Sequence, residues 1–213
     1  NGLREFRYRN EFDLDFLPRI VADKKSEGLG EVKSRGLTSC IVPIGGGKDS
    51  ATTLNIIQKT GLKTIGFSVG TFEPINRCAG VAGIDLVRVS RSIDPTLFEL
   101  NQQGAPNGHI PVTAINSSLA NIAAIAIGFD AVVMSNEASA DEPTRNIDGL
   151  EINHQWSKST EAERLLREVL KSNEISVEYF SALRGLSEFQ IFELFADFDE
   201  YHKAFTSCNR AFR

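Results

Sequence analysis

Short apolar runs alternate with segments of helical periodicity along the middle of the chain. Four runs rich in β-branched residues predict strands: TSCIVPI (38–44), LKTIGFSV (62–69), IDLVRVS (84–90) and DAVVMS (130–135). Strands that alternate with helices pair in parallel through right-handed crossovers. The pattern therefore predicts an α/β fold with a doubly wound, mostly parallel sheet.

The helices between these runs are predicted from apolar spacing and from residues typical of helix ends. Helical patterns cover residues 49–59 and, interrupted by glycines, 75–83. Asp94 and Pro95 are an N-cap residue followed by proline, which is typical of a helix start. The apolar segment 111–128 begins with proline and ends with glycine, so it predicts one long helix.

The flanks differ from this pattern, and they divide the chain into an N-terminal segment (1–36), an α/β domain (37–174) and a helical C-terminal extension (175–213). FRYRNEFDLDF (6–16) alternates as an edge hairpin does. Residues 135–156 are polar and lack periodicity, and such a long stretch inside a domain is usually functional or mobile. Capping-box spacing predicts helix starts at Thr160 (with Glu163) and at Ser187 (with Gln190).

Composition narrows the classes of partner. The 213 residues carry a net charge of −5, which gives no bulk electrostatic attraction to nucleic acids or anionic membranes. No apolar run reaches the roughly 18 residues of a membrane-spanning helix. Cys40, Cys78 and Cys208 are scattered and odd in number, which favours a reducing, cytoplasmic setting over a disulfide framework or a zinc site.

The segment GGGKDS (45–50) carries the clearest chemical signal, because it joins a predicted buried strand to a helix start. Gly45, Gly46 and Gly47 let an anion approach the backbone amides. The first turn of the following helix adds free N–H groups and the positive end of its dipole. Lys48 adds a positive charge and Ser50 a hydroxyl donor. A phosphate group satisfies all of these features at once.

Two familiar phosphate-loop patterns fail here. In G-x-x-x-x-G-K-[ST], Val42 occupies the first glycine position and Asp49 the Ser/Thr position. In G-x-G-x-x-G, Ser50 replaces the last glycine. A carboxylate repels a phosphate unless a cation intervenes, so Asp49 indicates either Mg²⁺ bridging to phosphates or a cap on the helix amides.

GGGKDS after a strand resembles the pyrophosphate loop of the N-type ATP pyrophosphatases, whose usual S-G-G-x-D-S has serine where this chain has Gly45. The resemblance implies an adenine nucleotide alpha hydrolase-like fold for residues 37–174, with ATP split between its α and β phosphates. It also implies that the end of the second strand, at Phe67, Ser68 and Val69, meets adenine largely through backbone groups.

The fourth strand leads into the polar stretch, which should overhang the same edge of the sheet. That stretch offers Glu137, Asp141 and Glu142 as Mg²⁺ ligands, with Glu137 favoured because it stands at the strand end. His154, Gln155, Lys158 and Ser159 are the candidate polar contacts. Lys158, near a helix start, could hold a phosphate or a substrate carboxylate.

Taken together, GGGKDS, HIPVTAINS, SNEAS, NHQWSKSTEAE and SCNRAFR resemble the ATP-dependent UDP-N-acetylmuramoyl-L-alanyl-L-glutamate epimerases of bacterial cell-wall synthesis. The resemblance covers residues 38–213 and implies a small-molecule substrate, the UDP-muramoyl dipeptide. It implies adenylation of a glutamate carboxylate, inversion at its α-carbon, and release of AMP and pyrophosphate. The family is longer than this chain, so the resemblance implies a fragment or a shortened relative.

The residues leave the proton-abstracting base and the reaction class open. Histidine titrates near neutrality, so His154 is the first candidate base and His109 the second; Cys208 is a third if its pKa is lowered. An amide-forming ligase or a thiolase would use the same adenylate. A non-catalytic ATP- or AMP-binding module would need the glycine loop but not the polar stretch.

Overall fold

A five-stranded parallel sheet forms the centre of the protein. The computed structural model describes residues 3–13, 21, 36–108 and 110–207. The strand order is β3-β2-β1-β4-β7, and every neighbouring pair is parallel. The strands are β1 (Ser39–Pro43), β2 (Lys63–Val69), β3 (Leu86–Val89), β4 (Ala131–Met134) and β7 (Glu178–Ser181). The prediction of a doubly wound α/β fold is confirmed.

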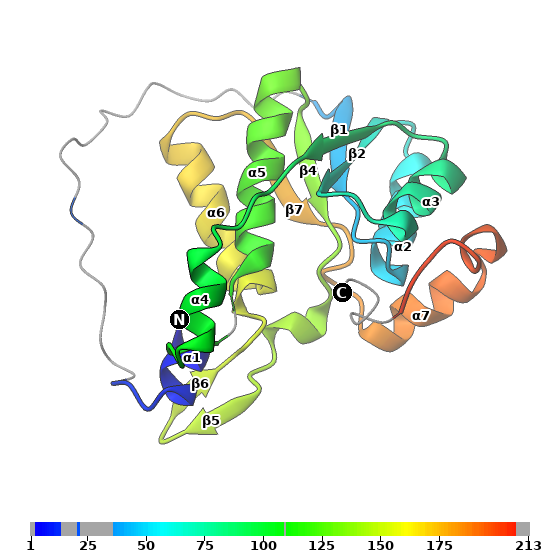
Figure 1. Cartoon of the computed structure of the whole chain (residues 1–213). Helices are drawn as coiled ribbons and strands as arrows, with labels where there is room; N and C mark the ends of the chain where they lie inside the picture. Colours follow the sequence, from blue (N-terminus) through cyan, green and yellow to red (C-terminus); the bar gives the residue numbers. More distant parts are fainter. Residues whose placement is uncertain (1–2, 14–20, 22–35, 109, 208–213) are drawn as a thin grey trace.

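Helices cover both faces of the sheet (Figure 1). On one face lie α2 (Lys48–Gln58) and α3 (Glu73–Ala82), and α7 (Glu188–Ala196) packs on α2. The opposite face carries α5 (Val112–Ile127), which contacts β1 and β4, and α6 (Thr160–Ser172), which contacts β7. The predicted helices at 49–59, 75–83 and 111–128 are therefore present, with ends shifted by one or two residues.

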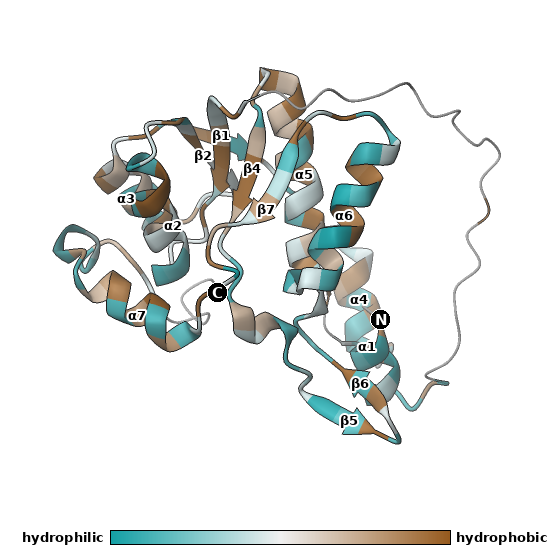
Figure 2. Ribbon diagram, turned by 180° about the vertical axis from the view of Figure 1, so that it is seen from behind, coloured by the Kyte–Doolittle hydropathy of each residue, from teal (hydrophilic) through white to brown (hydrophobic). Residues whose placement is uncertain are grey.

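The core consists of two apolar layers, one on each face. Along β1 the side chains alternate between them: Cys40 and Val42 pack with Leu54 of α2, whereas Ile41 packs with Ala120 of α5 and Val132 of β4. Strands that are buried on both faces are apolar at nearly every position, and the ribbon coloured by hydropathy shows the central strands brown (Figure 2). This explains why the strand predictions succeeded.

Local signals set several helix ends as expected. Gly83 and Gly128 follow α3 and α5 in the left-handed conformation, with φ of 65° and 72°. Ser187 caps α7 in a complete capping box with Gln190. The helix predicted after Asp94 is α4 (Thr96–Gln102), but its N-cap is Pro95 and not Asp94, whose carboxylate accepts a hydrogen bond from the Thr96 amide at 2.9 Å.

Two expectations about the flanks were wrong, and one hairpin was not predicted. The N-terminal hairpin is not formed, because Arg4–Arg9 is a helix, α1; residues 14–16 of the expected hairpin segment lie outside the described residues. The polar stretch contains an antiparallel hairpin of β5 (Arg145–Ile147) and β6 (Leu150–Ile152). The segment 175–213 is not purely helical, since it begins with β7, which extends the main sheet.

The remaining described elements are short 3₁₀ turns: η1 (Ala138–Asp141), η2 (Trp156–Lys158) and η3 (Asp199–Tyr201). The start of α6 also differs from its prediction by one residue. Ser159 is the N-cap, and its side chain accepts a hydrogen bond from the Ala162 amide. The Thr160 hydroxyl donates to the Asp141 carboxylate instead. Within the part of the chain that the structure describes, none of the helices has the length and apolar character needed to cross a bilayer.

Candidate functional site

The topology brings the two predicted site segments to one edge of the sheet. The crossover from β1 passes through α2 on one face, and the crossover from β4 passes through α6 on the other (Figure 1). Adjacent strands with diverging crossovers form a switch point, and ligands of open α/β sheets bind outside the carboxyl ends there. Residues 44–47 leave β1 at this edge, and residues 135–137 leave β4.

The glycine loop is held in a conformation that requires glycine at Gly46. Its φ is +80°, and a Cβ at this position would lie 2.8 Å from Pro74 Cβ in the first turn of α3. The Gly46 carbonyl accepts a hydrogen bond from the Thr206 amide at 2.8 Å. The loop is therefore fixed from two sides by segments distant in sequence, α3 and the C-terminal region, and the sequence alone indicated neither contact.

The loop presents backbone donors. Gly47 is the N-cap of α2 in an extended conformation, and it has no side chain to cap the first turn. Across the described ranges, no acceptor is bonded to the amides of residues 45–50; the first backbone bond of the helix runs from Ala51 N to Gly47 O. Gly45 is exposed, and a Cβ there would meet nothing within 4 Å. This arrangement is suited to an anion at the positive end of α2.

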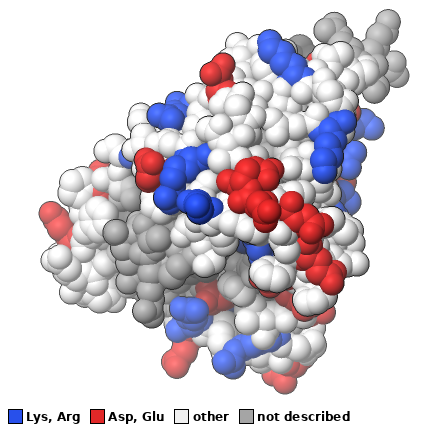
Figure 3. Space-filling model, turned by 90° about the vertical axis from the view of Figure 1, so that its right-hand side faces the viewer, with Lys and Arg blue, Asp and Glu red and all other residues white. Residues whose placement is uncertain are grey.

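Lys48 is paired with carboxylates. Its Nζ lies 2.7 Å from Asp49 Oδ1 and 3.5 Å from Glu188 Oε1 at the start of α7. Burial lowers the pKa of Lys48, but the hydrogen bond and charge of Asp49, with those of Glu188, outweigh it and leave the pKa above its ordinary value. Lys48 therefore remains cationic. On the side of the molecule that carries α3 and α7, acidic and basic side chains are interspersed (Figure 3).

The other predicted nucleotide contacts have structural partners of their own. Ser50 is buried, and its Oγ donates to Gly47 O at 3.0 Å, so the hydroxyl braces the loop. Phe67 is 1% exposed in the core beneath α5, and its carbonyl accepts from Ile44 N at 2.8 Å. Ser68 is buried, its Oγ donates to Gly70 O at 3.3 Å, and Val69 packs against the same core. Adenine recognition by backbone groups stays a prediction.

The acidic residues after β4 are also engaged. Glu137 Oε1 accepts from Ser139 Oγ at 3.3 Å. The Asp141 carboxylate accepts from the amide and the hydroxyl of Thr160, both at 2.6 Å, and so ties η1 to the start of α6. In the described residues there is no group of three or more His, Cys, Asp or Glu side chains that could hold a metal ion. A cation here would need phosphate oxygens as further ligands.

His154 and Lys158 lie on one segment that follows β6. His154 is exposed, and its Nδ1 lies 2.5 Å from Thr144 Oγ1. Lys158 is half-buried in η2, where its amide donates to Gln155 O at 2.7 Å. Neither of these two contacts involves the glycine loop. His109 lies outside the described residues.

Arg184, which the sequence interpretation missed, links the separate parts of this edge. Its Nη1 donates to Glu137 O at 3.1 Å, and its Nη2 donates to Lys158 O at 2.7 Å and to Glu163 Oε2 at 2.9 Å. The Arg184 and Glu163 side chains are 19% and 12% exposed. One guanidinium thus joins the end of β4, the η2 turn and α6. An arginine after a strand has no distinguishing spacing, so no sequence signal identified it.

The chain is similar to one protein family and to three proteins of described activity. The model of the MurL N-terminal domain family matches residues 1–182. Three similar proteins, each described as a UDP-N-acetyl-alpha-D-muramoyl-L-alanyl-L-glutamate epimerase, match all of this chain: 44% identity in Micromonospora sp., 42% in Salinispora tropica and 38% in Xanthomonas oryzae pv. oryzae. The chain covers 48%, 47% and 47% of them, about half of their length.

Two solved structures align with about three quarters of this chain at low identity. A predicted subunit of tRNA methyltransferase from Methanocaldococcus jannaschii aligns over 75% of this chain and 75% of its own, with 15% identity and a TM-score of 0.47. NMN synthetase from Francisella tularensis aligns over 77% of this chain and 63% of its own, with 16% identity and a TM-score of 0.43.

Proposed function

This chain belongs to the MurL N-terminal domain family, and we propose that it is the nucleotide-binding half of an ATP-dependent UDP-N-acetylmuramoyl-L-alanyl-L-glutamate epimerase. The names of the three relatives support the epimerase activity. The observation that carries the ATP dependence is the row of amides at residues 45–50, which have no acceptor among the described residues and are located at the switch point of the sheet. We assign the reaction to cytoplasmic synthesis of peptidoglycan precursors.

The glycine loop is the proposed site for the triphosphate. Amides that point outward at the start of α2 stabilise negative charge without a side chain, and the helix dipole adds to this. Gly45, Gly46 and Gly47 allow the phosphates to approach the backbone, while Ser50 keeps the loop in shape through Gly47. The backbone of residues 67–69, at the end of the adjacent strand β2, is the proposed contact for adenine.

Lys48 and Asp49 are proposed to act together. In the structure they neutralise each other at 2.7 Å. Bound triphosphate would compete for the Lys48 ammonium, and Asp49 would then be free to take a Mg²⁺ ion bound to the phosphates. Glu137, at the end of neighbouring β4, is the proposed second carboxylate. Mg²⁺ supplies charge neutralisation at the phosphates in such a site.

The chemistry follows from the charge of the substrate. A carboxylate resists loss of its α-proton, because deprotonation places a second negative charge beside the first. When a carboxylate oxygen attacks the α-phosphorus of ATP, pyrophosphate leaves and the resulting acyl-adenylate no longer carries that carboxylate charge. A base then removes the α-proton, a proton returns to the opposite face, and water hydrolyses the adenylate to AMP and the inverted glutamate.

His154 and Lys158 are the residues we propose for the substrate side. A neutral imidazole can accept the α-proton near pH 7, and the Nδ1 of His154 lies 2.5 Å from Thr144 Oγ1. Lys158 is proposed to hold a phosphate or carboxylate oxygen, on a turn fixed by Arg184. His109 is the second candidate for the base.

The proposal is tested with the full-length protein by following pyrophosphate release from ATP. We expect release that depends on the muramoyl dipeptide and needs no added amine, together with D-glutamate in the product. Asp49→Asn should reduce release at least tenfold, whereas Asp85→Asn, an exposed aspartate before β3, should leave it unchanged. Release only with an added amine would instead indicate a ligase. Nucleotide binding without release would indicate a non-catalytic module.

A further inference from the structure

The long helix α5 lacks the polar outer face that is typical of a surface helix. None of its sixteen residues, VTAINSSLANIAAIAI, is charged. Its buried side, with Ala120 and Ala124, packs on β1 and β4, yet large apolar side chains also lie on its outer side. A surface helix normally carries charged or polar side chains on its outer side. The outer side of α5 is therefore expected to be covered in the complete protein.

Apolar residues on the outer side of α5 have the spacing of a helix-packing seam; four of the five are exposed, and Leu119 is partly buried against the core. Val112, Ile115, Leu119, Ile122 and Ala126 follow one another at intervals of three, four, three and four residues. Ile115 is 44% exposed and Ile122 is 61% exposed. Such a stripe fits the grooves of another helix. We call these five residues the α5 stripe.

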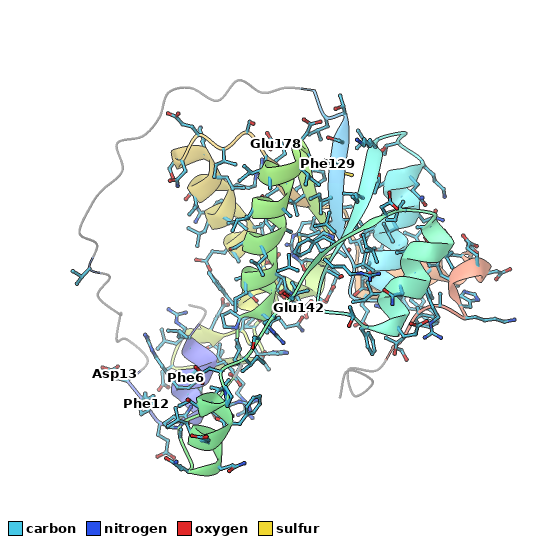
Figure 4. The ribbon with its side chains drawn as sticks, turned by 45° about the horizontal axis from the view of Figure 1, so that its top comes forward. Phe6, Phe12, Asp13, Phe129, Glu142 and Glu178 are labelled. Atoms are coloured by element: carbon cyan, nitrogen blue, oxygen red, sulfur yellow. The ribbon has the colours of Figure 1, made fainter. Side chains whose placement is uncertain are left out.

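A cavity of about 310 Å³ lies at the C-terminal end of α5, where Ala124, Ile125 and Gly128, and not residues of the α5 stripe, line it. It is formed where α5 ends and where the chain approaches β7, with apolar walls from Ile125, Phe129 and Val177 and with carboxylates from Glu174 and Glu178. Phe129 and Glu178 lie close together at the amino ends of β4 and β7, the edge opposite the glycine loop (Figure 4). The cavity therefore suits an apolar side chain that is followed by a basic one.

We propose that the α5 stripe and this cavity form the interface with the part of the full-length protein that lies beyond this chain. The relatives matched along the whole chain are about twice as long, so each has a comparable length of polypeptide available to cover this face. The covering element is a helix that packs along the α5 stripe. Residues that follow this helix pass the end of α5 and place an apolar side chain in the cavity and a lysine or arginine beside Glu174 and Glu178.

The cavity lies at the edge of the sheet opposite the glycine loop, whereas α5 also contacts η2, the turn that carries Lys158. The function of the interface is to join the nucleotide-binding half to the remainder of the protein. A relative with another activity would therefore keep apolar residues at this interface.

Thiol labelling of the full-length protein tests the interface. Ile122→Cys and Ile115→Cys each place a thiol on the α5 stripe, and Val81→Cys places one on α3, where Val81 is 38% exposed on the opposite face. Each variant is labelled with a maleimide in the folded state and in urea, and the parent protein gives the background of its native thiols. We expect both stripe variants to react at least tenfold more slowly, relative to urea, than the Val81→Cys variant.

The alternatives give distinct results. Equal relative rates at the stripe and at Val81→Cys would overturn the proposal, because the α5 stripe would then be open in the complete protein. Protection that increases with protein concentration, together with a dimer in sedimentation, would also overturn it, because a second copy would be the covering element. If one stripe variant does not fold, the other stripe variant answers the same question.

Discussion

Replacing Gly46 by alanine should destabilise the protein through the loop itself. Gly46 has φ +80°, and its missing Cβ would lie 2.8 Å from Pro74 Cβ and 3.1 Å from the Ile75 amide nitrogen. Both atoms belong to the first turn of α3, and the proline ring cannot rotate away. The substitution therefore forces the loop and α3 apart.

The expected magnitude has two parts. A non-glycine residue in the left-handed region costs about 1–2 kcal/mol. Forcing an extra carbon into a packed contact costs about 1–3 kcal/mol more. Together they predict a loss of about 2–5 kcal/mol in the free energy of unfolding for Gly46→Ala.

Gly45→Ala is the matched control, because its Cβ would meet nothing within 4 Å. Urea unfolding should give a change in the free energy of unfolding within about 0.5 kcal/mol for this variant. Its methyl group would nevertheless stand on the exposed side of the loop, so ATP binding measured by calorimetry should weaken. The reasoning is refuted if Gly46→Ala unfolds like the parent protein, or if the two variants lose equal stability.

Three further predictions concern stability. Asp130 accepts hydrogen bonds from the hydroxyls and amides of residues 38 and 39, chiefly the Thr38 hydroxyl, which lowers its pKa to about 2. The pKa of an aspartate in the unfolded state is about 3.9, so the contribution of Asp130 to the free energy of unfolding is present above pH 4 and lost between pH 4 and 2. The thermal unfolding of Asp130→Asn should therefore depend less on pH in that range than the thermal unfolding of the parent protein. Arg184→Met should cost about 3 kcal/mol, because Glu163 is left unpaired and largely buried, and a double-mutant cycle with Glu163→Gln should recover part of the loss. Ser187→Ala removes the N-cap of α7 and should cost about 1 kcal/mol in urea unfolding; no loss would mean that the capping box is not stabilising.

Local patterns in the sequence predicted the central domain. The strands could be predicted because both faces of the sheet are buried, so that β1 and β4 are apolar at nearly every position. Gly83 and Gly128 ended helices where the backbone turns left-handed. The glycine loop could also be predicted, because its chemistry depends on consecutive residues and on the strand and helix that flank it.

Contacts between distant segments could not be predicted from local sequence patterns. The strand β7 has only four residues, and its place in the sheet depends on pairing with β4. The segment that became α1 alternates like a strand, yet it forms a helix that bonds to β6 through Arg4 and to β5 through Tyr8. The pairing of Lys48 with Glu188 likewise joins residues from α2 and α7 that only the packing of these helices brings together.

Local spacing by itself thus determined the fold class and the loop that faces the carboxyl edge, since hydrophobic period and glycine conformation act within a few residues. Only the tertiary structure decided the strand order, the joining of Glu137, Lys158 and Glu163 by Arg184, and the apolar outer side of α5. Each of these depends on how far-separated segments are packed, and packing energy is a property of the neighbours and not of any one stretch of sequence.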